Sequence, residues 1–219
     1  MVDAEIVAAL AGAVTGAIVG GGVTWIVQKS QLRFQRKLIE DDLLERRRAL
    51  AHSLVLKLIK IGNDISTLRK HVEDGLAESN DLQMWSGVVQ ISNLPEPIRL
   101  TSEELWLLAK AKDGLFNKSI QIDTIHHGYI RLLSNYSARR TELGDMLPQT
   151  RRATGAGHFA LEPDERKLLE PRMIELNTML TEIVEKGDRD QGKVEAVLFR
   201  AIDHLNVTLD LDLKFEKSN

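Results

Sequence analysis

A charge-free run of 22 residues, from Ile6 to Val27, constrains this 219-residue chain more than any other feature. As a helix the run is about 33 Å long, which is enough to cross the hydrocarbon core of a bilayer. Asp3 and Glu5 precede it, only basic charges follow it between positions 29 and 37, and Trp25 lies near its C-terminal end. Because cytoplasmic flanks are rich in Lys and Arg, the pattern predicts a single-pass anchor with the N-terminus outside the cell.

Two other interpretations compete with the anchor. A secretory signal peptide carries positive charge before its apolar stretch, whereas the leading residues here are acidic. A buried Gly- and Ala-rich helix of a soluble domain also fits, because the run is only moderately hydrophobic. We favour an anchor in the inner (plasma) membrane, with membrane lipid as a partner and the remaining chain in the cytoplasm.

The run contains a repeated small-residue pattern. Gly12, Gly16 and Gly20 form GxxxGxxxG, and residues four apart lie on one face of a helix. In lipid, small residues let two helix backbones approach closely, so packing drives their association. The pattern predicts a face for a second copy of the chain or for another membrane protein. An anchor that does not associate is the alternative.

Beyond the anchor the sequence predicts an all-α fold of long helices. Apolar residues recur at intervals of three and four in two stripes, over 44–72 and 108–136, which only Arg47 and Lys118 interrupt. Two such helices can fold back as an antiparallel pair within a bundle. The same stripes also fit a coiled coil between chains, and periodicity does not choose between these arrangements.

Helix-capping and helix-breaking residues divide this all-α chain further. Thr101 and Glu104 form a capping box, Pro171 is expected to kink or restart a helix, and Gly187 to end one before a last helix over about 190–206. The predicted organisation is a transmembrane anchor over 1–28, a long helical hairpin over 29–146, a loop over 147–162, and C-terminal helices packing on the hairpin over 163–219.

The tail alternates apolar and polar residues from 207 to 215, which is typical of a strand. Helix continuation and an extended tail are the alternatives.

The sequence contains no motif that predicts an enzyme. The absence of Cys excludes disulfides, Cys–zinc sites and thiol nucleophiles. There is no P-loop and no G-x-S-x-G elbow, and the six histidines lack metal-ligand spacing. His126 and His127 are expected to be solvated or to pack between helices. We therefore expect no catalytic residue, no cofactor and no metal ion.

Four arginines gather within 14 residues and form one candidate anion-binding cluster: Arg139, Arg140, Arg151 and Arg152. A solvated basic patch is the alternative. No aromatic residues are interleaved to stack on bases, and the net charge is −3, which argues against nucleic acid as a partner.

These features predict a non-enzymatic, membrane-anchored helical interaction protein: a scaffold, sensor or accessory subunit that self-associates or docks a membrane protein through its glycine face. The alternative is a membrane-perturbing effector of the toxin or phage-defence type that assembles through its anchor. A membrane-tethered enzyme is the third possibility.

Overall fold

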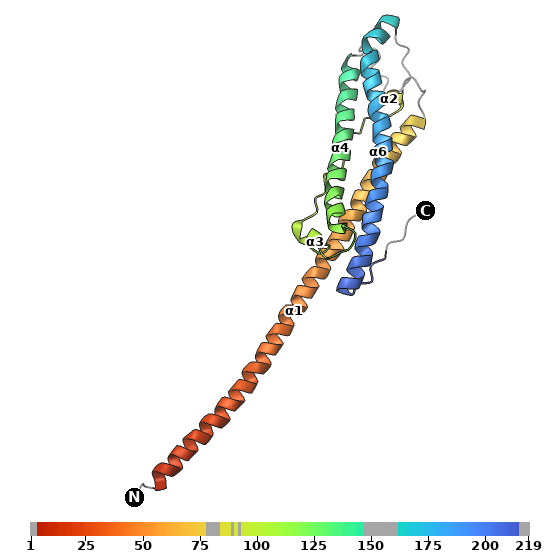
Figure 1. Cartoon of the computed structure of the whole chain (residues 1–219). Helices are drawn as coiled ribbons and strands as arrows, with labels where there is room; N and C mark the ends of the chain where they lie inside the picture. The colour runs from red at the N-terminus through yellow and green to blue at the C-terminus, as the bar shows by residue number, and fades with distance from the viewer. Residues whose placement is uncertain (1–3, 78–83, 89, 92, 147–161, 215–219) are drawn as a thin grey trace. The chain divides into compact units, whose positions relative to one another are not determined.

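The computed structural model describes residues 4–77, 84–88, 90–91, 93–146 and 162–214, and it describes side chains from Trp25 on, Ile26 excepted. The described elements are all helices: α1 (Ala4–Ala77), α2 (Met84–Gly87), α3 (Ser102–Trp106), α4 (Leu115–Met146) and α6 (Pro163–Leu209) (Figure 1). The predicted all-α class is confirmed for this part of the chain. The chain divides into two compact units, one up to Ala49 and one from Leu50 on.

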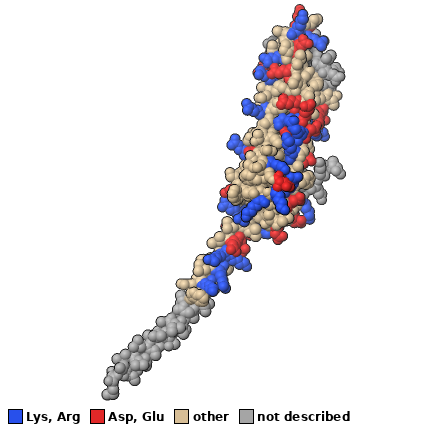
Figure 2. Space-filling view, in the orientation of Figure 1, with Lys and Arg blue, Asp and Glu red and all other residues tan. Residues whose placement is uncertain are grey.

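The first unit consists of the α1 residues up to Ala49. Every side chain described between Trp25 and Arg47 is exposed, including large apolar ones such as Phe34 and Ile39, which are 64% and 60% exposed. The described side chains of this unit therefore form no buried core, and Figure 2 shows basic and acidic side chains on the surface of this part of α1.

The predicted membrane span, residues 6–27, lies outside the side chains that the structure describes, apart from Trp25 and Val27. In the described part of the chain, no helix has a stretch that is both long and apolar enough to cross a bilayer. The predicted loop over 147–162 also lies outside the described residues, except for Glu162, which caps the start of α6.

The second unit packs three long helical segments around one core: residues 50–77 of α1, α4 and α6. The α1 stripe is buried from Ala51 to Val72 as predicted, whereas its first member, Leu44, is 37% exposed. Figure 1 shows α4 and α6 side by side. The two predicted stripes therefore contribute to a core within one chain, which α6 completes.

The core segment of α1 and α4 run in the same direction, so the predicted antiparallel pairing of these two helices is wrong. Asp64, midway along the α1 core segment, contacts His126 on α4 at 3.2 Å. Earlier on α1, Lys57 contacts Glu104, which precedes α4, at 2.8 Å. A residue further along α1 therefore contacts a residue further along the chain toward α4, as is expected for two segments that run in parallel.

The helix that runs antiparallel to both is α6. Arg69, near the end of α1, pairs with Asp188, whereas Gly62 faces Val194 further along α6. The described residues between Val88 and Thr101 are not helical. About a dozen residues extended at about 3.3 Å each reach about 40 Å, close to the roughly 48 Å length of α4. This connection can thus return the chain along the bundle, which apolar periodicity does not reveal.

The second predicted stripe begins in the non-helical residues before α4, where Leu108 and Ala111 lie, and only part of it is shifted by one position. Thr101 and Glu104 form the predicted capping box, but α3 ends at Trp106, and Asp113 and Gly114 then adopt positive φ angles of 60° and 65°. Such angles suit glycine and interrupt a helix.

Within α4, the core seam passes through Ser119, His126 and Leu133 rather than through Lys118, Ile125 and Leu132. The other predicted α4 positions, at 115, 122, 129 and 136, are buried as expected. Apolar spacing misplaced the rest of the seam because two of its core positions, Ser119 and His126, are polar. Lys118 and Ile125 consequently lie at the edge of the core.

Helix α6 is continuous through both residues expected to interrupt it. Leu169 and Met173 on either side of Pro171 are buried in the same core, which holds the helix together although proline removes one backbone hydrogen bond. A Cβ atom at Gly187 would lie only 2.7 Å from the Tyr129 hydroxyl oxygen and 3.1 Å from Arg69. This glycine therefore permits a close approach of side chains from two neighbouring helices and does not end the helix.

The alternating tail contains no strand among its described residues. Helix α6 continues to Leu209, Asp210 adopts a left-handed conformation, and residues 211–214 have no regular secondary structure. The Asn206 side chain bonds both the N–H and the carbonyl of Leu213 at 2.9 Å, so a helix side chain replaces a neighbouring strand. Residue 215 lies outside the described part.

Candidate functional site

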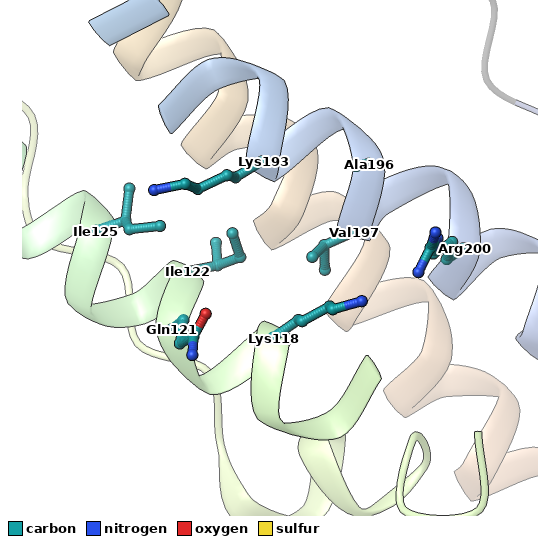
Figure 3. A pocket seen from close by; sticks show the side chains of 8 residues that line it. All are labelled: Lys118, Gln121, Ile122, Ile125, Lys193, Ala196, Val197 and Arg200. Atoms are coloured by element: carbon teal, nitrogen blue, oxygen red, sulfur yellow. The ribbon is translucent and has the colours of Figure 1, made fainter. Parts of the chain in front are cut away.

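A small groove between α4 and α6 is the candidate site, with a cavity volume of about 280 Å³ (Figure 3). Each helix contributes four residues at positions i, i+3, i+4 and i+7, which share one helix face. Those residues are Lys118, Gln121, Ile122 and Ile125 from α4, and Lys193, Ala196, Val197 and Arg200 from α6.

The groove combines an apolar floor with a cationic rim. Ile122 and Val197 belong to the bundle core and are nearly fully buried, which makes the floor rigid and apolar. Lys118, Lys193 and Arg200 bring positive charge to the edge. An anionic group attached to an apolar body matches both parts of this surface.

The three rim cations have different partners. Lys193 contacts Asp190 at 3.2 Å, and this carboxylate is only 1% exposed and is also held by Lys186 and Arg189. Arg200 reaches Asp113 at 4.0 Å, and both of those side chains are exposed.

Lys118 has no ion pair among the residues that the structure describes. Figure 3 shows its side chain directed toward Arg200. The end of the groove between these two residues is therefore its least neutralised part.

A second polar site, a histidine clamp formed by His126 and His127, holds the backbone of Ile98. The Ile98 N–H donates to Nδ1 of His126 at 3.3 Å, and Nε2 of His127 donates to the Ile98 carbonyl at 3.2 Å. Because Nδ1 of His126 accepts, its proton is on Nε2, which donates to Asp64 at 3.2 Å.

This arrangement requires neutral His126. Burial lowers the pKa of His126 below its usual 6.5, while the charge and hydrogen bond of Asp64 oppose that shift. Nearby His127 lowers the pKa further and Asp123 raises it. The clamp fixes the non-helical segment around Ile98 against α4, and this role is structural. The two histidines were expected to be solvated or to pack between helices. His126 packs between helices and is fully buried.

The structure places only part of the predicted arginine cluster. Arg139 pairs with Glu142 at 2.8 Å and with Glu175 at 3.5 Å, whereas the Nε–H of Arg140 donates to the Trp85 carbonyl at 3.3 Å. The Arg140 guanidinium also lies 5.9 Å from the Trp85 ring centroid. Arg151 and Arg152 lie outside the described residues, so an anion site built from all four remains a prediction.

Gly12, Gly16 and Gly20 occupy helical positions of α1, where their four-residue spacing keeps them on one face. The described residues contain no group of three or more His, Asp or Glu arranged to hold a metal ion.

Comparison with protein-family models, with curated proteins and with solved structures gave no match for this chain. Function is therefore argued from the residues of this chain.

The groove was missed at the level of sequence, although a signal for it exists. Lys118 interrupts the second apolar stripe and is followed four positions on by Ile122, and α6 repeats this spacing with Lys193 and Val197. Recognising that these two faces meet requires the direction of the helices.

Proposed function

We propose that this protein is a single-pass, membrane-anchored helical interaction protein that self-associates or docks a partner span through the Gly12–Gly16–Gly20 face. The observation that carries the proposal is the charge-free run of 22 residues followed by four basic residues without an acidic one. This flank favours an N-terminus outside and a cytoplasmic helical bundle. The proposal assigns no reaction to the chain.

Local geometry near the end of the run supports an interfacial position. The Trp25 side chain is 62% exposed, and the ammonium of Lys29 lies 4.7 Å from its ring centroid. An indole ring with an adjacent cation suits the headgroup level, where its apolar body and its polar edge both find partners.

The glycine face continues to the end of the run and beyond it in the same helical phase. Val27, Phe34 and Leu38 follow Gly20 at intervals of seven, seven and four, and all three described side chains are exposed. This spacing keeps one seam on a helix. A second copy of α1 in parallel could cover the glycines within the bilayer and these apolar residues outside it.

Substitution within the seam tests the proposal. A large side chain at Gly16 would separate the helices yet leave the segment at least as hydrophobic, so Gly16→Ile should reduce association and keep membrane localisation. Ile18→Leu, on a different face, is the matched control. Association is measured by crosslinking or by a two-hybrid assay in membranes. Equal association of wild type and Gly16→Ile would show that the Gly12–Gly16–Gly20 face does not mediate association.

A further inference from the structure

We propose that the α4–α6 groove binds a small amphiphilic carboxylate, which is a short acyl chain carrying a single acidic headgroup. This inference concerns the second unit alone and does not depend on the anchor. It rests on the positive charge at one end of the groove, on the apolar surface at the other end, and on the size of the groove.

The headgroup end lies between Lys118 and Arg200. These two cations come from different helices, Figure 3 shows the Lys118 side chain directed toward Arg200, and Lys118 has no ion pair among the described residues. Asp113 reaches Arg200 only at 4.0 Å and is itself exposed, so it neutralises the pair weakly. An anion placed here accepts charge-assisted hydrogen bonds from both side chains and relieves their mutual repulsion.

The other end of the groove is apolar. Ile122 and Val197 form the floor, and Ile125 extends it away from the headgroup end. Lys193 crosses this end in Figure 3. Because buried Asp190 holds the ammonium of Lys193, its methylene stem is free to cover an acyl chain instead of competing for the headgroup.

The size and charge of the groove select the ligand class. A volume of about 280 Å³ is just below the usual range for small-molecule sites, which favours a ligand smaller than a two-chain lipid. Three cations opposed by Asp190 and Asp113 leave a modest positive excess, which favours a monoanion. No aromatic side chain lines the groove, so a nucleotide base would find nothing on which to stack.

A set of matched probes tests the chemistry on the full chain, held in nanodiscs of zwitterionic lipid. Hexanoate should produce saturable shifts of the Ile122 and Ile125 methyl resonances in NMR titrations. Acetate lacks the chain and hexanol lacks the charge, so each should bind at least about tenfold more weakly. Hexanol binding as tightly as hexanoate would overturn the proposal, as would hexyl phosphate binding where hexanoate does not.

Substitutions at exposed groove positions test the location. Lys118→Gln and Arg200→Gln should each weaken hexanoate binding about tenfold through loss of one charge-assisted bond. Ala196→Trp should block the groove without removing a core side chain. Arg131→Gln, an exposed position on α4 outside the groove, is the control and should bind as wild type does. Unchanged affinity in both Gln variants would place any binding elsewhere and overturn the proposal.

Discussion

Residues 25–47 and residues 51–72 belong to the same helix and are similarly rich in apolar residues, yet their side chains end in opposite environments. In the later segment most apolar residues follow one face and are buried, from Ala51 to Val72, whereas Leu56 is exposed. In the earlier segment they occupy two faces about 200° apart, one with Trp25 and Leu32 and the other with Phe34. A single apolar face can be covered by a bundle of the same chain, whereas two opposite faces call for lipid or other chains.

The largest expected effect comes from placing the same charge in each region. Ile61 is fully buried in the second unit, whereas Ile39 is 60% exposed in the first. Ile61→Asp buries an unpaired carboxylate and removes core packing, so it should lower the free energy of unfolding by about 4 kcal/mol or more. Ile39→Asp should change it by less than about 0.5 kcal/mol.

Circular dichroism melts of the full chain measure this comparison. Similar melting temperatures for the two variants would show that the stripe of the second unit is not its core.

A smaller effect should follow from filling the close approach between helices in the second unit. Gly187→Ala places a Cβ atom against Tyr129 and Arg69, which should cost about 1–2 kcal/mol of stability after the gain in helix propensity. Gly192, on the same helix, has open space around it, so Gly192→Ala should stabilise the protein by up to about 1 kcal/mol.

Denaturant unfolding of both alanine variants gives the two changes in free energy. Stabilisation by both alanine substitutions would mean that Tyr129 and Arg69 lie further from Gly187 than in this structure.

The smallest effect is a pH dependence that the histidine clamp gives to the second unit. Burial holds the pKa of folded His126 below the 6.5 of the unfolded chain. As pH falls below about 6.5, the unfolded state therefore takes up a proton that the folded state resists, so stability decreases on acidification. At pH values above that window His126 is neutral in both states and contributes no slope.

Urea unfolding at a series of pH values measures how the free energy of unfolding changes with pH. His126→Gln should reduce this pH dependence, whatever the substitution does to the absolute stability. A slope that is identical in wild type and His126→Gln would assign the acid sensitivity to other groups.

Sequence reasoning predicted the helical class, the buried α1 stripe and the capping box at Thr101, because each depends on local spacing. It missed the parallel course of α1 and α4, since local patterns do not encode the path of the connection before Thr101, whose described residues are not helical. It also expected breaks at Pro171 and Gly187. Core packing on both sides of Pro171 and the Tyr129 contact at Gly187 outweigh these local preferences.

The candidate groove depends on the same missing information. Its α4 half includes Ile125, which periodicity assigned to the core seam, and Lys118, which periodicity treated as an interruption. The true seam uses Ser119 and His126, whose polar side chains become core residues only through the contacts that they make. Placing a groove between two helices therefore required the tertiary structure.

Measuring the membrane topology of the chain tests the contrast between the two regions most directly. The full chain, expressed in a bacterial host, should remain in carbonate-washed inner membranes, and a variant lacking residues 6–27 should be released. Protease added to intact spheroplasts should leave residues 50–219 protected, and protease added to inverted vesicles should digest them. Extraction of the full chain by carbonate, or digestion of the bundle in intact spheroplasts, would contradict the account.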